Sequence, residues 1–210
     1  MTYSFPNWLR QGLAAIAFTL CAAGAAQAQE APDAMVRRVA EEVITIVKAD
    51  PLVQAGNQAR IREVIETKLL PNFDFTRMTA LAMGKNWRSA SPEQQQKLTD
   101  EFRALLVRTY SGALGRYRDE KIDYKPLRSN PADTEVTVRT AVLKPGGQPI
   151  QIDYSMEKTP SGWKVYDVVV GGVSLVTNYR EEFNQQVQSG GVDGLIRTLA
   201  DKNKAVPSKS

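Results

Sequence analysis

The first half of the chain places its apolar residues three and four positions apart, the spacing of one helix face. One predicted helix is capped by Asp33, and a second ends before Pro71. Their apolar stripes are Val36, Val39, Ala40, Val43 and Val47, then Ile61, Val64, Ile65 and Leu69. A short third helix, around residues 76–83, ends at Gly84. The fourth has the strongest start signal, because Ser91-Pro92-Glu93-Gln94 supplies an N-cap, a proline at the first position and a capping-box glutamine.

From residue 122 the pattern changes to an alternation of apolar and polar residues, which is typical of strands. The apolar positions of four such runs are Ile122 and Tyr124; Val136, Val138 and Val142; Ile150, Ile152, Tyr154 and Met156; and Trp163 and Val165, leading to Val170. The turns between them are short, so we expect an antiparallel meander of four strands. The intervening positions of the middle strands are polar, which predicts one wet and one apolar sheet face.

The segment that follows changes from strand to helix through two glycines. Gly171 and Gly172 permit a tight reversal, and Ser174 can cap the helix that begins after it. A second glycine pair at 190–191 separates a final short helix. Helices, then a sheet, then helices again indicate an α+β fold, and residues 29–202 fit a single domain. Residues 203–210 are expected to form a disordered tail.

The pattern of the N-terminus is typical of a cleaved secretory signal peptide, which we predict over residues 1–28. Arg10 is its only charge, an apolar run covers residues 13–26, and Ala26-Gln27-Ala28 provides the small residues that a signal peptidase requires. The run is shorter than the roughly 20 residues of a membrane span. Cys21 leaves with the signal, because Leu20 before it is too large for a lipid-attachment site.

Cleavage removes much reactive chemistry from the mature chain. The chain has no histidine and its one cysteine lies in the signal, so disulfides, thiolate nucleophiles, imidazole bases and histidine-ligated metals are excluded. The formal charge of +4 is reduced by one when Arg10 leaves. Such a mild basic excess does not indicate nucleic-acid binding in an exported protein. It suits brief contact with anionic lipid surfaces or with acidic faces of a partner, but solvated helix faces are the favoured interpretation of its basic pairs.

Two long segments resemble the MlaC family, also called the toluene-tolerance family. The first is the glycine-linked run YDVVVGGVSLVTNYREEF over residues 166–183. The second covers residues 73–117 and carries Gly84, Trp87, Arg88, Phe102, Tyr110 and Leu114 at the spacing that family shows. Neither is a catalytic motif, and the resemblance covers nearly all of the mature chain.

The resemblance implies a four-stranded antiparallel sheet wrapped by six to seven helices around an elongated hydrophobic cavity. The family consists of periplasmic carriers that hold the acyl chains of a phospholipid, with the cavity mouth near the glycine-linked segment. By position in the matching motif, Val173 is the first candidate for a lipid contact. The other candidates are the inward positions of the matching strands and long helix: Val169, Val165, Ile150, Ile152, Tyr154, Val138, Phe102, Leu106 and Tyr110.

The resemblance also implies partners and a mode of action. The carrier exchanges phospholipid between the inner-membrane MlaFEDB complex, through MlaD, and the outer-membrane MlaA complex, which maintains outer-membrane lipid asymmetry. No bond is made or broken, the phospholipid is cargo, and neither cofactor nor metal is expected.

Two other classes of function stay open on the residues alone. A small α+β enzyme could use the carboxylates Asp153, Glu157 and Asp167, although Asp167 is flanked by valines and a buried hydrogen-bonding role is favoured for it. A chaperone-like protein could instead hold a partner helix in an apolar groove. A co-purified lipid or polypeptide would distinguish the carrier from the groove.

Overall fold

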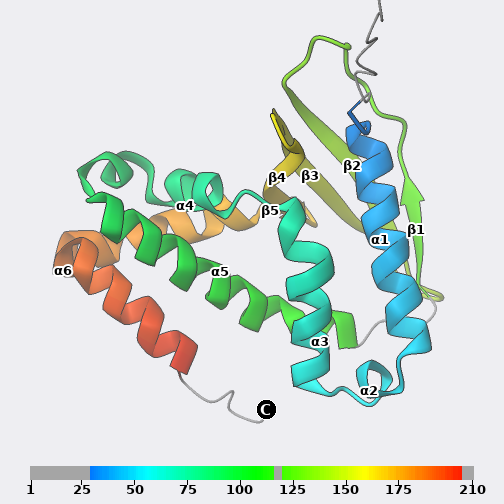
Figure 1. Cartoon of the computed structure of the whole chain (residues 1–210), viewed down its shortest axis with the longest axis horizontal. Coiled ribbons are helices and arrows are strands. Elements are labelled where there is room, and N and C mark those ends of the chain that lie inside the picture. Colours follow the sequence, from blue (N-terminus) through cyan, green and yellow to red (C-terminus); the bar gives the residue numbers. More distant parts are fainter. Residues whose placement is uncertain (1–28, 116–119, 205–210) are drawn as a thin grey trace, which may run out of the picture.

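The computed structural model describes residues 29–115 and 120–204 and arranges them as helices, an antiparallel sheet and a long broken helix (Figure 1). The predicted signal peptide lies outside the described residues, as do residues 116–119 and 205–210. Two parts can be seen in Figure 1: α1 runs along the sheet, and α4, α5 and α6 pack together beside it.

The helical first half follows the predicted order, with shorter pieces between the long helices. Its elements are α1 (Pro32–Ala49), α2 (Pro51–Gln54), α3 (Gln58–Val64), a π-helical turn η1 (Ile65–Leu69), the 3₁₀ turn η2 (Leu70–Asn72), α4 (Phe75–Met83), the 3₁₀ turn η3 (Gly84–Ser89) and α5 (Pro92–Gly115). The predicted cap at Asp33 is wrong, because α1 starts at Pro32 and Asp33 lies in its first turn. The capping box is confirmed: the Gln94 amide N–H donates to Ser91 Oγ (3.2 Å) and the Ser91 N–H donates to Gln94 Oε1 (2.9 Å).

The sheet has five strands in the order β1-β2-β3-β4-β5, one more than the sequence predicts. They are β1 (Lys121–Tyr124), β2 (Glu135–Leu143), β3 (Ile150–Thr159), β4 (Gly162–Val170) and β5 (Val173–Ser174), all antiparallel to their neighbours. The extra strand forms because Gly171 and Gly172 adopt φ values of 58° and 87°, which turn the chain back at once. Val173 then pairs with Val170, and Ser174 with Val169.

A β-bulge in β4 changes which residues face which side. Ser155 of β3 pairs with Asp167 while the next residue, Met156, pairs with Val165, so Tyr166 is the extra residue of the bulge. Because side chains alternate along a strand, the extra residue shifts the alternation of β4 by one position. Val165 and Val168 therefore share the face that carries Val138 and Tyr154, which we call the inner face.

The last helix, α6 (Leu175–Lys204), is broken at Gly191, where φ is 67° and ψ is −177°. This is the break predicted at the second glycine pair. The helix continues through Lys204, two residues into the segment expected to be disordered, because Asn203 Nδ2 donates to the Glu101 carbonyl (2.9 Å) and to Glu101 Oε2 (2.7 Å).

Three groups of buried side chains hold these elements together. Met35, Val36 and Val39 of α1 pack on the inner face of the sheet. The second half of α1 packs instead against α2 and α3, with Val43 and Val47 buried there. The largest group joins α4, α5 and α6, where the ring of Phe102 makes edge contacts with Tyr179 and Phe183, each at 5.1 Å between centroids. The face of α1 is therefore divided between two partners.

The carboxylate of Asp167 fixes the start of α6 to the sheet. Its Oδ1 accepts hydrogen bonds from the backbone N–H of Val168 (2.8 Å) and of Val176 (3.1 Å). Its Oδ2 accepts one from the Ser174 hydroxyl (2.6 Å), and Ser174 Oγ in turn accepts from the Thr177 N–H as the predicted cap. One side chain thus connects β4, β5 and the first turn of α6.

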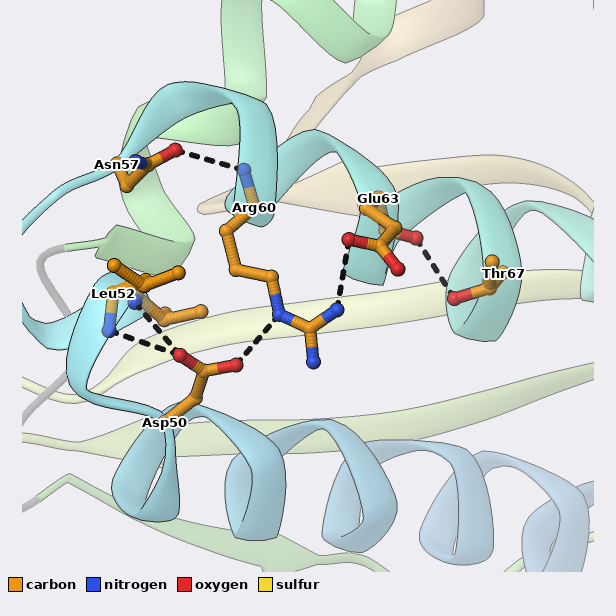
Figure 2. Close-up of polar contacts among 7 residues, drawn as sticks. Asp50, Leu52, Asn57, Arg60, Glu63 and Thr67 are labelled. Atoms are coloured by element: carbon orange, nitrogen blue, oxygen red, sulfur yellow. Dashed lines mark hydrogen bonds and ion pairs between the residues drawn. The ribbon is translucent and has the colours of Figure 1, made fainter.

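A second polar group joins the end of α1 to α3 (Figure 2). Asp50 accepts from the backbone N–H groups of Leu52 (2.9 Å) and Val53 (3.3 Å), and Arg60 Nε donates to its Oδ2 (2.6 Å). The Arg60 guanidinium also forms an ion pair with Glu63 at 2.8 Å. The hydrogen bond from Arg60, with those from Val53 and Leu52, lowers the pKa of the Asp50 carboxyl below its ordinary value.

We expect replacement of Asp50 by Asn to reduce the acid sensitivity of the fold. A carboxyl with a lowered folded pKa stabilises the protein above its unfolded pKa of about 4, and that contribution is lost as the pH falls through the folded pKa. Urea midpoints measured from about pH 6 downwards should therefore fall less steeply for Asp50→Asn than for the unmodified protein. The exposed Asp201→Asn variant should follow the unmodified curve, and parallel curves for all three proteins would contradict the role of Asp50.

Replacing Asp167 by Ala should lower the free energy of unfolding by about 2–3 kcal/mol, because it leaves the hydrogen-bond donors of α6 and Ser174 without their acceptor. The measurement is urea unfolding followed by circular dichroism. Asp201→Ala, on the exposed side of α6, is the matched control and should change the value by less than about 0.5 kcal/mol. Equal effects of the two substitutions would show that Asp167 does not hold the start of α6.

Candidate functional site

The inner face of the sheet carries no charge from Val136 and Met156 to its exposed end at Val173, and its one charged position in the described strands is Lys158, beyond Met156 at the far end of β3. Strand register places on this face Val136, Val138, Thr140 and Val142; Ile150, Ile152, Tyr154 and Met156; Val165, Val168 and Val170; and Val173. The Thr140 hydroxyl is buried and donates to the Ile152 carbonyl (3.0 Å). Burial raises the pKa of the Tyr154 phenol, which stays neutral at physiological pH. This face can therefore accept an apolar ligand without desolvating a charge.

Burial decreases along this face from the part under α1 towards Ile150 and Val173. Val138, Met156 and Val165 lie under α1 and are at most 3% exposed. Further along, Ile150 is 47% exposed, Val170 is 37% exposed and Val173 is 56% exposed. Ile152 pairs with Val170, and Val170 pairs with Val173, so these side chains continue the same face. We call Ile150, Ile152, Val170 and Val173 the open end of the inner face.

The structure brings together six of the ten candidate residues. Val138, Val165, Ile152 and Tyr154 belong to the group formed by α1 and the sheet. Ile150 and Val173 lie at the open end that continues from them. The other four lie elsewhere. Phe102 and Leu106 are buried among α4, α5 and α6, and Tyr110 is an exposed residue of α5.

The expectation that Val169 points inward is wrong. Counting alternate residues from Val165 puts Val169 on the inner face, but the bulge at Tyr166 shifts the alternation. Val169 pairs with Asp153 and so lies on the opposite, polar face. Val168 and Val170 take the inward positions that the sequence analysis missed. Three successive valines fit either alternation equally well, so the pattern carried no signal for the bulge.

The three carboxylates considered for catalysis lie on the polar face and are engaged by other groups. Glu157 pairs with Arg77 of α4, whose guanidinium also stacks on the Tyr166 ring at 3.7 Å from the centroid. Asp153 lies 3.9 Å from Arg139 Nε, and Asp167 accepts three hydrogen bonds at the start of α6. The apolar open end and the carboxylates therefore occupy opposite faces of the sheet.

Two pockets are found away from the candidate residues. One, of about 290 Å³, lies between the α3–η1 segment, α5 and Asn203, and includes Arg62, Arg103 and Arg108. The other, of about 650 Å³, is a polar opening around Gln29 and Trp163. None of the ten candidate residues lines either pocket, so the expected elongated cavity corresponds to neither of them. No helix in residues 29–115 and 120–204 has the length and apolar character to cross a bilayer.

The chain is similar in sequence to a phospholipid transport protein and to a toluene tolerance protein. The chain is 24% identical over 175 residues to the intermembrane phospholipid transport system binding protein MlaC of Haemophilus influenzae, a match that covers 82% of each chain. It is 26% identical over 188 residues to the toluene tolerance protein ttg2D of Pseudomonas putida, covering 88% of this chain and 85% of that one.

A solved structure supports the same relationship. The phospholipid-binding protein of Ralstonia solanacearum, determined in complex with a phospholipid, is 40% identical and superposes with a TM-score of 0.77 over 81% of this chain and 96% of that one. The family described as MlaC protein matches residues 37–201. Because that match extends from the first turns of α1 almost to the end of α6, the chain belongs to the MlaC family.

Proposed function

We propose that this protein is a periplasmic phospholipid carrier that holds acyl chains against the open end of the inner face. The observation that carries the proposal is the continuous uncharged stretch of this face from Met156 to Val173, which is buried under α1 at Met156 and exposed at Val173. The structurally similar protein of Ralstonia solanacearum was determined with a bound phospholipid, and the relatives are named for phospholipid transport and toluene tolerance. The predicted signal peptide supports the periplasmic location.

The energetics explain why such a carrier needs an extended apolar surface. Two acyl chains of about 15 methylenes each would cost roughly 24 kcal/mol to expose to water, at about 0.8 kcal/mol per CH₂. A phospholipid therefore leaves a bilayer unaided only very slowly. The carrier must shield nearly all of that surface, whereas the polar headgroup can stay in water at the exposed end.

We assign different parts of the face to different stages of lipid entry. Val173, Ile150 and Ile152, with Val170, are accessible in the arrangement described here and would meet the acyl chains first. Val138 and Val165 are covered by α1, so a chain reaches them and the half-buried Tyr154 only when α1 moves away from the sheet. Contact with Phe102 or Leu106 would require α5 and α6 to separate, which makes these two the least accessible candidates.

The carrier would exchange its cargo with membrane complexes at both ends of its path. We propose the inner-membrane MlaFEDB complex, through MlaD, and the outer-membrane MlaA complex as its partners. Binding and release then involve no covalent step, and the partners set the direction of net transport. A carrier of this kind maintains the lipid asymmetry of the outer membrane without a cofactor or a metal.

Val173→Glu should remove the lipid that co-purifies with the protein while leaving the fold intact. A carboxylate at this position would have to be desolvated by an acyl chain, and we expect at least a tenfold loss of retained lipid. Organic extraction followed by mass spectrometry measures the lipid per mole of protein. Leu52→Glu is the matched control, because Leu52 is similarly exposed (53%) but lies on α2.

The lipid extraction separates three questions: whether the protein carries lipid, whether it binds a polypeptide instead, and whether lipid enters at Val173. A compact, cooperatively folded unmodified protein that yields no lipid would contradict the carrier function, and a bound polypeptide in the extract would support the groove alternative. Lipid retained by Val173→Glu would show that the site of entry is elsewhere.

The β-bulge predicts opposite outcomes for two adjacent valines. Val170→Gln places an amide on the inner face and should reduce retained lipid about tenfold, since burying an unpaired amide costs about 1–3 kcal/mol. Val169→Gln places the same amide on the polar face next to Asp153 and should retain lipid at the unmodified level. Urea unfolding of both variants serves to separate loss of binding from loss of stability. The reverse order of lipid loss would mean that acyl chains lie on the other face of the sheet.

A further inference from the structure

One end of the sheet consists of two glycine-containing turns that lie side by side. The turn between β2 and β3 covers residues 144–149, and Gly171-Gly172 joins β4 to β5. The Gly171 N–H donates to the carbonyl of Gln151 (2.8 Å), the second residue of β3, so the second turn lies beside the strand that leaves the first. Residues 143–151 and 170–173 are all exposed. We call these residues, together with Lys121 at the start of β1, the sheet tip.

Exposed apolar side chains are concentrated at the sheet tip. Of the six large hydrophobic residues that are exposed in the described part of the chain, four belong to it: Leu143, Ile150, Val170 and Val173. The other two lie on α2 and α5. Four such side chains at the ends of neighbouring strands exceed the single exposed residues that are normal on a protein surface. Ile150, Val170 and Val173 lie on the inner face and Leu143 lies on the opposite face, so the tip is apolar on both sides of the sheet at the entrance to the inner face.

Positive charge accompanies this apolar surface. Lys121 pairs in register with Leu143, and Lys144 follows Leu143 in the chain, so both lysines border the apolar residues. Both are exposed, and neither forms an ion pair with a carboxylate of the described residues.

The neighbouring carboxylates do not cancel these charges. Asp123 is paired with Lys125 at 2.5 Å, and Asp153 lies within 3.9 Å of Arg139. Glu120 also has an interaction of its own. The tip therefore combines exposed aliphatic side chains with two positive charges that no partner in the described residues compensates, the combination found on surfaces that bind the interface of anionic membranes.

We propose that the sheet tip docks on the surface of a leaflet that contains anionic phospholipids. This inference rests on the proposed carrier function and adds where the carrier meets the membrane. The lysine ammonium groups would contact headgroup phosphates while Leu143 and Val173 enter the boundary between headgroups and acyl chains. Docking in this way places the open end of the inner face against the lipid, so an acyl chain moves from bilayer to protein with little exposure to water. The leaflet interface fits this surface because it offers anionic phosphates to the two lysines and acyl chains to the exposed aliphatic side chains.

The test measures binding to vesicles by co-flotation. The unmodified protein should bind vesicles of phosphatidylcholine and phosphatidylglycerol, and should bind vesicles of pure phosphatidylcholine much more weakly. At high salt its binding to the two kinds of vesicle should become equal, because salt screens the attraction between lysine and phosphate. Lys121→Gln and Lys144→Gln each remove one positive charge, and each should weaken binding about fivefold. The double variant should bind roughly 25-fold more weakly than the unmodified protein. Lys158→Gln is the matched control, because Lys158 is exposed at the opposite end of β3. It should bind as the unmodified protein does.

The possible results of these measurements distinguish docking through the sheet tip from the carrier function. Unchanged binding by the double variant, or an equal loss in Lys158→Gln, would overturn docking through the tip. A protein that carries lipid in its extract but does not bind the anionic vesicles would also overturn it and would indicate that the tip contacts a protein. Absence of lipid from the extract is a separate result that refutes the carrier function itself. Lipid measurement on every variant thus separates the two hypotheses.

Discussion

The division of α1 between two partners determines how much of the sheet is covered. Met35, Val36 and Val39 pack on the inner face, whereas Val43 and Val47 pack against α2 and α3. A single helix that contributes half its apolar stripe to each group cannot cover a face built from strands of nine and ten residues. The uncovered remainder is the open end. The network around Asp50 and Arg60 supports this arrangement, because it fixes the turn at which α1 passes into α2 and α3 (Figure 2).

The order of elements could be predicted from the sequence because local signals specify it. The capping box at Ser91, the glycine break at Gly191 and the alternation in β2 and β3 each depend on residues a few positions apart. The fifth strand is two residues long, too short to give a period of its own. The start of α1 was misplaced by two residues, because a proline at the first position and an acidic side chain in the first turn both indicate a helix start.

The site was less predictable because its composition depends on pairing between strands. Alternation assigns Val165 and Val169 to one face, and only the register with β3 shows the extra residue at Tyr166. Likewise, the stripe of α5 predicts that Phe102 is buried, but cannot show that Tyr179 and Phe183 bury it instead of a ligand. A sequence pattern specifies that a residue avoids water. Which surface replaces the water is decided by tertiary packing.

The open end has an energetic consequence for the protein without its cargo. Complete burial of a valine or isoleucine side chain contributes about 1.5–3 kcal/mol relative to exposure. Ile150, Val170 and Val173 each gain only part of that contribution, since between 37% and 56% of each residue stays exposed. An acyl chain laid along them would recover the remainder without disturbing the packing under α1. In the proposed binding mode, initial binding would need no unfolding of the core, whereas deeper entry would separate α1 from Val138 and Val165. This difference between an accessible and a covered part of the same face would allow the protein to take up a lipid at one membrane and release it at another.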